Sequence, residues 1–215
     1  MSKFCSYRMA AVHRALFVIM GETRAMKRKD LVKREISHTL KELCKVQSLP
    51  SITVSKLCSE CGISRGTFYY HFLDILDLIN WTAEEDIFKP LLADIETWSY
   101  EWNGIIRKCL QNLYDNKEFY CQAVKMEGPN CPNEYFKTRN LECWDIVVKK
   151  YVHHTGQEYD ETTLRFLTQY TSQAIVNMTI DWAREGMKTP VDTLAYLFDI
   201  ATYGLYRTTR GEPMS

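Results

Sequence analysis

The chain has 215 residues, and its 27 Lys and Arg balance its 27 Asp and Glu, so its formal net charge at pH 7 is zero. Taken as a whole, this neutrality argues against a nucleic-acid partner, and the scarcity of Pro and Gly, without Asn-Gly or Asp-Gly hairpin signals, argues against a β-rich fold. The charge is unevenly placed, since residues 1–80 hold 13 Lys and Arg against 7 Asp and Glu, whereas residues 81–215 hold 14 against 20. A basic N-terminal third joined to an acidic remainder is typical of a nucleic-acid-binding domain followed by a second domain. The apolar spacing favours helices nearly throughout, which predicts an all-α fold of two domains.

Residues 1–25 form an N-terminal extension that adds positive charge. Its apolar run, Ala15 to Met20 between Arg14 and Arg24, is far shorter than the about 18 residues that cross a bilayer. A signal peptide fits poorly, because the run of about six residues is below the seven to fifteen expected of its apolar core. We therefore expect no membrane partner and a cytoplasmic location.

A first helix is predicted from about Lys29 to Val46. Its expected core face is apolar at helical spacing: Leu31 or Val32, Ile36, Leu40, Leu43 and Cys44. The basic residues Lys27 and Arg28 precede it, and they either contact DNA phosphates or belong to a solvated helix face.

The stretch from Ile52 to Phe72 reads ITVSKLCSECGISRGTFYYHF and predicts two short helices separated by a glycine turn. Thr53 can cap the first helix, and Gly62 suits the left-handed position after its end. Ser64 can cap the second helix, in which Phe68 and Phe72 share a buried face at i and i+4. This arrangement predicts a helix-turn-helix, whose second helix enters the major groove of DNA.

The second helix begins with residues suited to contacting base edges. Arg65 can bond guanine in a bidentate fork, Thr67 offers a hydroxyl or a methyl, and Gly66 allows a close backbone approach. One turn later, Tyr69, Tyr70 and His71 are placed to hold phosphates, which set register without reading sequence. The alternative is a pair of small packed helices in an all-α protein without a DNA partner.

The run TVSKLCSECGISRGTFYYHF resembles the DNA-binding signature of TetR-type transcriptional regulators, and residues 26–81 resemble their three-helix N-terminal domain. The resemblance extends to the branch that includes dihydroxyacetone-kinase regulators. It implies DNA contacts at these positions: Thr53, Ser64, Arg65, Thr67, Tyr69 and His71. A chain of this family normally begins near Met26, so residues 1–25 are an added extension or the product of an upstream start.

Two positions depart from the family pattern. The family commonly places a Lys two or three residues after the His-Phe pair, where this chain has Leu73, Asp74 and Ile75. An Arg or Lys often found early in the preceding helix is replaced by Ser55, although Lys56 is adjacent. Each lost phosphate contact removes a salt-dependent increment of DNA affinity.

The second domain is predicted to span residues 74–215, after a helix-turn-helix domain at 26–73. A helix from about Asp74 should kink or restart at Pro90, which removes a backbone donor. Further helices are expected at 91–98, 104–113, 117–126 and 133–151, with the clearest break in the loop 128–132.

Two long helices are predicted to end the chain, at about 160–185 and from Thr189 as cap with Pro190 at the first helical position. Both are apolar over more than one stripe, which is typical of helices that are central or shared with a partner. TetR-type proteins use their last two helices as a dimer interface, so the resemblance implies a homodimer on a palindromic operator in double-stranded DNA. The expected interface residues are Leu167, Ala174, Ile175, Met178, Leu194, Phe198, Ala201 and Leu205.

Many aromatic residues lie between Trp81 and Tyr170, where they can line a pocket for an apolar effector or simply fill the core. The family resemblance implies an inducer cavity in this region. We assign it four candidate residues: Trp102, Tyr120, Trp144 and Tyr170.

The cysteines predict neither a disulfide framework nor a metal site. Cys58 and Cys61 have zinc-ligand spacing without a second close pair, and small buried cysteines commonly pack like apolar residues. Cys131, in a loop, is the one candidate redox sensor. The sequence contains no phosphate loop and no recognisable hydrolase or metalloprotease motif, so we expect no enzyme activity and no cofactor.

Together these features predict a dimeric TetR-like transcriptional regulator that binds DNA, a repressor released by an unknown small-molecule effector. The alternative is a TetR-fold co-regulator that acts mainly through a protein partner rather than by strong operator binding.

Overall fold

The computed structural model describes residues 29–97, 102–129, 131–156 and 158–209, and this part of the chain is helical without strands. A first helix occupies residues 29–44. The following elements are η1 (Leu49–Ser51), α2 (Val54–Cys61), α3 (Arg65–His71), α4 (Ile75–Ala83), η2 (Glu84–Phe88), α5 (Lys89–Glu96), α6 (Trp102–Asp115), α7 (Lys117–Ala123), α8 (Pro132–Thr155), α9 (Glu161–Arg184) and α10 (Val191–Thr209). The predicted all-α class is confirmed.

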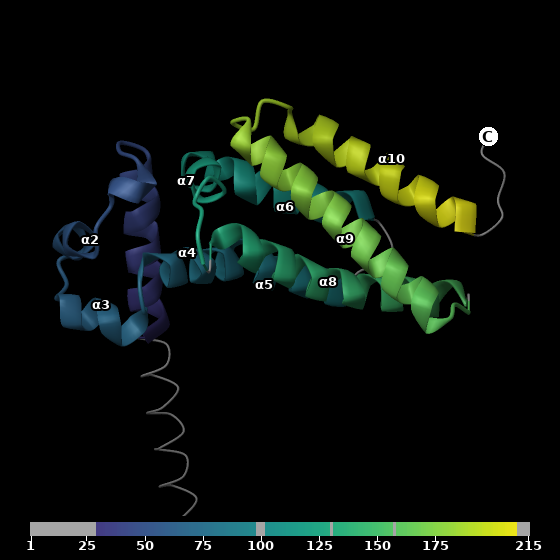
Figure 1. Cartoon of the computed structure of the whole chain (residues 1–215), viewed down its shortest axis with the longest axis horizontal. Coiled ribbons are helices and arrows are strands. Elements are labelled where there is room, and N and C mark those ends of the chain that lie inside the picture. Colours follow the sequence, from purple (N-terminus) through teal and green to yellow (C-terminus); the bar gives the residue numbers. More distant parts are fainter. Residues whose placement is uncertain (1–28, 98–101, 130, 157, 210–215) are drawn as a thin grey trace, which may run out of the picture.

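Figure 1 shows a small group of helices at one end of an elongated molecule and a larger bundle at the other. We call residues 29–73 the head and residues 74–209 the bundle. In the bundle α8 packs along α9, and α10 packs along α6. The segment α4–η2–α5 leads from the head into the bundle, and α7 contacts η1 of the head.

The core of the head forms as the apolar spacing predicts. Ile36 and Leu40 of the first helix and Phe68 of α3 are fully buried, and Phe72 is 2% exposed. Phe72 also meets the ring of Trp81 from α4, with centroids 5.7 Å apart. These contacts fix α3 against the first helix and the start of the bundle.

The predicted kink at Pro90 takes the form of the π-helix η2, which ends one residue before α5 begins. Pro90 has no N–H, so the carbonyl of Asp86 four residues earlier loses its usual helical donor. Asn112 of α6 supplies the missing bond, with its Nδ2 donating to the Asp86 carbonyl at 3.3 Å. A π-turn is a common way to absorb such a break within a helix.

Helix α9 ends as expected before Gly186, which has φ of 82°. The start of α10 differs slightly, since Val191 is its first residue and the Pro190 carbonyl accepts from Leu194 N at 3.0 Å. Pro190 therefore holds the cap position rather than the first helical position.

Candidate nucleic-acid interface and internal cavity

The turn between α2 and α3 is closed by local side-chain and backbone bonds. Thr53 Oγ1 accepts from Lys56 N at 3.2 Å, and Ser64 Oγ accepts from Thr67 N at 3.0 Å. Gly62 has φ of 65°, and the N–H of Ile63 donates back to the Cys58 carbonyl at 3.0 Å. Both caps and the left-handed glycine are confirmed, so the sequence itself sets the angle at which α3 is presented.

The first turn of α3 is open to solvent. Ser64, Arg65 and Gly66 are exposed and Thr67 is half-buried, while Thr53, Ser55 and Lys56 of the preceding helix are exposed as well. A Cβ added to Gly66 would meet only Ser64 Oγ, at 3.6 Å, so packing within the chain does not require glycine there.

Two tyrosines extend this surface along α3. Tyr69 is 49% exposed and Tyr70 is 71% exposed. The Arg65 guanidinium lies 6.0 Å from the Tyr69 ring, and Lys29 of the first helix lies 5.1 Å from the Tyr70 ring. Lys29 thus joins the surface, whereas Lys27 and Arg28 lie outside the described residues.

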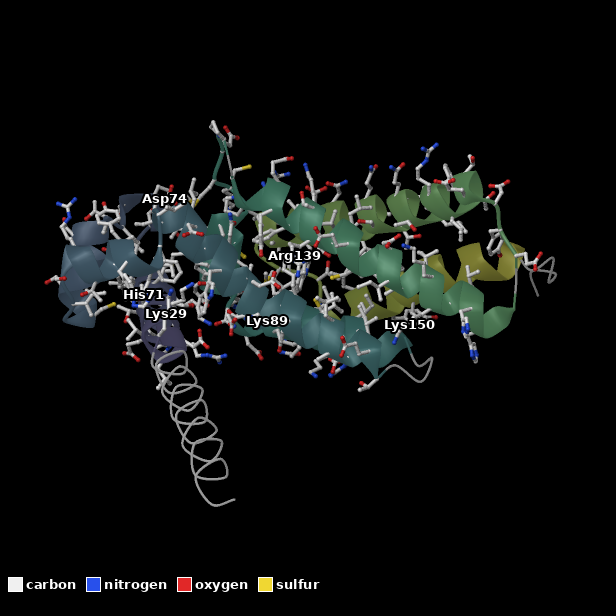
Figure 2. The ribbon with its side chains drawn as sticks, turned by 90° about the horizontal axis from the view of Figure 1, so that it is seen from below. Lys29, His71, Asp74, Lys89, Arg139 and Lys150 are labelled. Carbon is white, nitrogen blue, oxygen red and sulfur yellow. The ribbon has the colours of Figure 1, made fainter. Side chains whose placement is uncertain are left out.

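His71 differs from the other expected contact residues because it is half-buried, and its Nδ1 is buried without a hydrogen-bond partner. Desolvation lowers the pKa of His71 below its ordinary value of 6.5, and the nearby Lys29 and Lys33 lower it further. Figure 2 shows Lys29 and His71 together at one edge of the head. The imidazole is therefore neutral at pH 7, and it lacks the positive charge that would attract a phosphate.

Carboxylates occupy the start of α4, where the family commonly places a lysine. Asp74 caps this helix by accepting from Asp77 N at 2.8 Å, and Asp77 Oδ2 accepts from Leu73 N at 2.9 Å. Leu73 itself is 82% exposed. Two negative charges therefore satisfy the amides at this helix end, and they repel an approaching phosphate.

Three consecutive acids on η2 bond to neighbouring helices. Glu84 accepts two bonds from Arg139 of α8, Nε at 2.8 Å and Nη2 at 2.7 Å, and one from Tyr135 Oη at 2.7 Å. Burial raises the pKa of Glu84, but the bonds from Arg139 and Tyr135 lower it more, so its net pKa is below the ordinary value. Glu85 pairs with Arg34 of the first helix at 2.7 Å.

Asp86 joins the head to the wall of the bundle. Its Oδ2 accepts from Lys41 Nζ of the first helix at 2.8 Å and from Tyr120 Oη of α7 at 3.2 Å. Gln122 adds a second connection, since its Nε2 donates to the Cys44 carbonyl at 2.9 Å and its Oε1 accepts from Leu49 N at 2.7 Å. The orientation of the head is thereby tied to two side chains of α7.

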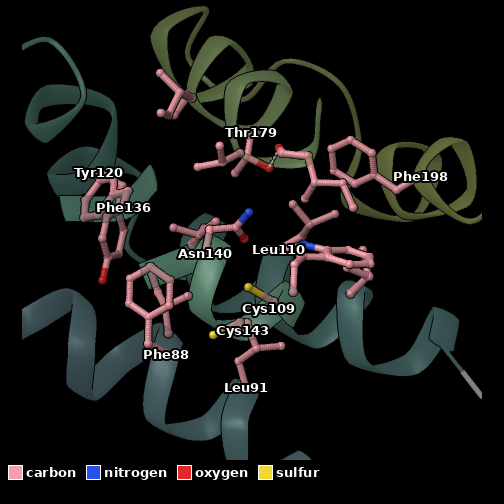
Figure 3. Close-up of a pocket in the computed structure, with 18 of the residues that line it drawn as sticks. Phe88, Leu91, Cys109, Leu110, Tyr120, Phe136, Asn140, Cys143, Thr179 and Phe198 are labelled. Carbon is pink, nitrogen blue, oxygen red and sulfur yellow. Dashed lines mark hydrogen bonds between the residues drawn. The ribbon is translucent and has the colours of Figure 1, made fainter. Parts of the chain in front are cut away.

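The bundle contains a partly open, mainly apolar cavity of about 80 Å³ (Figure 3). It lies among α5, α6, α7, α8, α9 and α10, and its lining includes Phe88, Leu110, Tyr120, Phe136, Trp144 and Phe198. Polar or sulfur-bearing groups reach it from Asn140, Thr179, Cys109 and Cys143.

Two of the four expected pocket residues, Tyr120 and Trp144, line this cavity. Tyr170 does not, because it is 54% exposed on the outer side of α9, and the side chain of Trp102 lies outside the described part. Sequence reasoning also missed Asn140. Its signal was its position four residues from both Phe136 and Trp144, which places a polar residue on the same helix face as two aromatic ones.

The expected interface residues on α9 and α10 divide between the core and the surface. Leu167, Ile175, Leu194 and Phe198 are buried within the protomer, so they were assigned to the wrong face, because both helices are apolar on more than one side. Ala174, Met178 and Ala201 are exposed, and the Leu205 side chain is outside the described residues. Other exposed apolar residues were not anticipated: Phe166, Tyr170, Tyr196, Leu197 and Ile200.

The described cysteines are free thiols, and Cys44, Cys58 and Cys143 are buried. Within the described ranges, no three His, Cys, Asp or Glu side chains gather where they could hold a metal ion. No described helix is both long and apolar enough to cross a membrane.

Comparison with known proteins gives a family match over part of the chain, one relative and a fold. Residues 100–203 match a family model described as the C-terminal region of a transcriptional regulator. The HTH-type dhaKLM operon transcriptional activator DhaS of Lactococcus lactis subsp. lactis (strain IL1403) is 25% identical over 158 residues, which make up 72% of this chain and 80% of that protein.

Two solved structures share the architecture. The dihydroxyacetone kinase operon activator DhaS has a TM-score of 0.61 at 21% identity, over 81% of this chain and 95% of that one. NalD, the secondary repressor of the MexAB-OprM multidrug efflux pump in Pseudomonas aeruginosa, has a TM-score of 0.59 at 14% identity, over 81% of this chain and 96% of that one.

Proposed function

We propose that this chain, which is similar to TetR-type transcriptional regulators, is a homodimeric repressor. In this proposal α3 reads a palindromic operator, and the bundle cavity binds the effector that releases it. The observation that carries the proposal is the exposed first turn of α3, where Ser64 caps the helix and Arg65 is free to reach a base edge. The open space beside Gly66 supports a close approach of the DNA backbone.

The phosphate contacts in this proposal come from exposed groups on two helices. Tyr69 and Tyr70 on α3 offer hydroxyl donors, and Lys29 on the first helix adds a positive charge beside Tyr70. Lys56 lies on the exposed side of α2 and completes the set. His71 contributes by packing and does not act as a cation, because its pKa is lowered.

Dimerisation in this proposal uses the exposed apolar faces of the last two helices. Phe166, Tyr170, Ala174 and Met178 recur every four residues along α9, and the Phe166 and Tyr170 rings stack with centroids 5.9 Å apart. Tyr196, Leu197, Ile200 and Ala201 form the corresponding face of α10. Apolar patches of this kind mark protein interfaces.

Effector control in this proposal passes through Asp86. Tyr120 forms part of the cavity wall, and its hydroxyl shares the Asp86 carboxylate with Lys41 of the head. A ligand that displaces Tyr120 breaks its bond to the carboxylate that also holds Lys41. The head then turns relative to the bundle. The ligand can shift the head to a second orientation only if it binds the protein with different affinity in the two orientations of the head.

The test of the DNA-reading assignment compares two single variants on a set of operator sequences. Arg65→Ala should relax sequence preference at one position, whereas Tyr69→Phe should weaken binding about equally on every sequence. Binding is measured by fluorescence anisotropy on the DNA flanking the gene and on single-base variants of it. The opposite pattern in the two variants would contradict the assignment of base and phosphate contacts.

The dimer assignment has its own test. Met178→Glu places a charge on the exposed apolar face of α9 and should convert the dimer to a monomer in sedimentation equilibrium. Arg184→Glu changes charge on the same helix beyond that face, and it serves as the matched control that stays dimeric. A dimer that survives Met178→Glu would place the interface elsewhere.

A second function is favoured by the carboxylates of Asp74 and Asp77 at the start of α4. A chain that repels phosphate at this point suits a TetR-fold co-regulator that acts mainly through a protein partner. The DhaS relative is named as an operon transcriptional activator rather than a repressor. Specific operator binding by the isolated protein at low salt separates the two functions, because the co-regulator would lack it.

A further inference from the structure

The lining of the cavity in the bundle includes an amide oxygen, Asn140 Oδ1, that accepts no hydrogen bond from the described residues. We propose that the cavity binds a small neutral alcohol, whose hydroxyl donates to Asn140 Oδ1 and whose apolar body contacts Leu110, Phe136 and Trp144. This inference rests on the proposed function, because it names the chemical class of the effector in the same cavity.

The orientation of the Asn140 amide follows from its neighbours. Its Nδ2 donates to the Ser172 carbonyl at 2.9 Å and to Ser172 Oγ at 3.0 Å. A carbonyl can only accept, so the amide nitrogen must face Ser172 and the oxygen must point to the other side. Figure 3 shows this oxygen turned toward the side of the cavity where Cys109 lies.

The Asn140 oxygen has no donor within hydrogen-bond distance among the described residues, although the residue is only 9% exposed. A water-sized molecule can reach this oxygen from the cavity. A ligand that takes that place without a donor would leave the amide oxygen unsatisfied, which costs free energy. The cavity therefore favours a molecule with one donor at this point over an entirely apolar one.

The size and lining of the cavity restrict the rest of the molecule. A dry cavity of about 150 Å³ accommodates benzene, so 80 Å³ suits a ligand with fewer non-hydrogen atoms than benzene. The described lining residues include no Lys, Arg, Asp or Glu, and an ionised ligand would lose its hydration without an ion-pair partner. A short, neutral alcohol meets both conditions.

The two thiols in the lining do not change this class. Burial raises the pKa of Cys109 to about 12 and the pKa of Cys143 to about 11. Both sulfurs are therefore protonated at pH 7, and a protonated thiol is neither a strong nucleophile nor a good ligand for a soft metal ion. The thiols contact the ligand as polarisable apolar groups, and the ligand binds reversibly.

The test uses two probes of the same shape, isobutanol and isobutyl chloride, of which only the alcohol has a donor. Both are titrated into the full-length protein, and binding is followed by the NMR signals of methyl groups that line the cavity. We expect the wild type to bind isobutanol about tenfold more tightly than isobutyl chloride, which corresponds to one hydrogen bond. The less water-soluble chloride would be favoured by an apolar cavity without a free acceptor, so equal or reversed affinity would overturn the proposal.

Three variants locate the interaction. Asn140→Leu keeps the side-chain volume but removes the acceptor, and it should abolish the preference for the alcohol. Asn133→Leu removes a buried amide of the same helix that does not line the cavity, and it should keep the preference. Cys109→Leu places more volume in the cavity and should lower the affinity for both probes at least tenfold.

The outcomes separate this inference from the proposed function. If the protein binds its operator specifically but binds no alcohol, the inference is overturned and the DNA-binding function stands. The same holds if the protein binds alcohol and Cys109→Leu leaves that binding unchanged. Selective alcohol binding by a protein that binds no operator supports the cavity assignment and overturns the regulator.

Discussion

The head and the bundle differ in how completely their interiors are filled. In the head, the polar residues of the turn stay at the surface, where Thr53 and Ser64 cap helices, and the interior is filled by Phe68 and Phe72. In the bundle, the polar side chain of Asn140 is inside, and the apolar helices leave a cavity of about 80 Å³. A close-packed core has no room for another molecule, whereas a core with a cavity can be empty or can contain a ligand.

This difference assigns different tasks to the two regions. The head presents α3 at a fixed angle, and the bundle supplies the space in which a small molecule can be bound. The connection between them is polar, since Asp86 bonds both Lys41 of the head and Tyr120 of the cavity wall. The four predictions that follow test the contrast between the filled head and the adaptable bundle.

The largest expected effect comes from emptying the core of the head. Phe68→Ala removes a fully buried ring and should lower the free energy of unfolding by about 3–5 kcal/mol. Tyr70→Ala, on the exposed side of the same helix, should change it by no more than about 0.5 kcal/mol. Urea denaturation at one fixed protein concentration measures both, and a similar loss in the two variants would contradict the filled-core description.

The second prediction compares the same substitution in both regions. Cys58→Leu adds volume to the packed turn of the head, where Cys58 is 3% exposed, and should cost about 1–3 kcal/mol. Cys109→Leu adds the same volume beside the cavity and should be neutral or stabilising by up to about 1 kcal/mol. Thermal unfolding of both variants beside the wild type checks this, and equal destabilisation would mean that the cavity has no room to fill.

The third prediction separates the regions by pH. The unfolded chain protonates His71 at an ordinary pKa of 6.5, but the folded head protonates it only at lower pH, so stability should fall as the pH drops below 6.5. Glu84 has a folded-state pKa below its ordinary 4.5, so its contribution is present above pH 4.5 and is lost as the pH falls through the folded-state value.

Two variants test which residue causes the loss of stability in each pH range. His71→Gln should flatten the pH dependence of stability just below pH 6.5, and Glu84→Gln should flatten it only below pH 4.5. Urea denaturation across this pH range gives both curves. The assignment would be reversed if Glu84→Gln flattened the curve just below pH 6.5, or if His71→Gln flattened it below pH 4.5.

The smallest effect concerns the acids at the start of α4. The double variant Asp74→Asn and Asp77→Asn keeps both oxygen acceptors but removes two negative charges, so the helix cap should survive. DNA affinity at low salt should rise several-fold, because each removed charge lowers the repulsion of phosphate. Glu60→Gln, an exposed acid on α2, is the control for a general change of charge. An affinity that does not change would place the start of α4 away from DNA.

Much of the head could be predicted because its structure is fixed by local rules. A cap residue, a left-handed glycine and two aromatic residues four positions apart each constrain a few neighbours, and Thr53, Gly62, Ser64, Phe68 and Phe72 all take the expected positions. The environment of His71 was not evident, because it depends on Lys29 and Lys33 from another helix.

The bundle was harder to predict because its helices are apolar on several sides. Ile175 and Phe198 face the cavity, whereas Met178 and Ile200 on the same helices face outward, and the periodicity alone does not separate the two faces. The π-turn at η2 also depends on a tertiary bond from Asn112, which no local pattern signals. The position of Pro90 predicted a break in the helix but not the form that the break takes.

Salt-dependent binding to the DNA that flanks the gene tests the central claim, that the head reads DNA. Fluorescence anisotropy of the full-length protein is measured on this DNA and on an unrelated duplex over a range of salt concentrations. We expect specific binding at low salt, with the logarithm of the affinity falling linearly with the logarithm of the salt concentration as phosphate contacts are lost. Equal affinity for both duplexes, or no binding at low salt, would contradict the account.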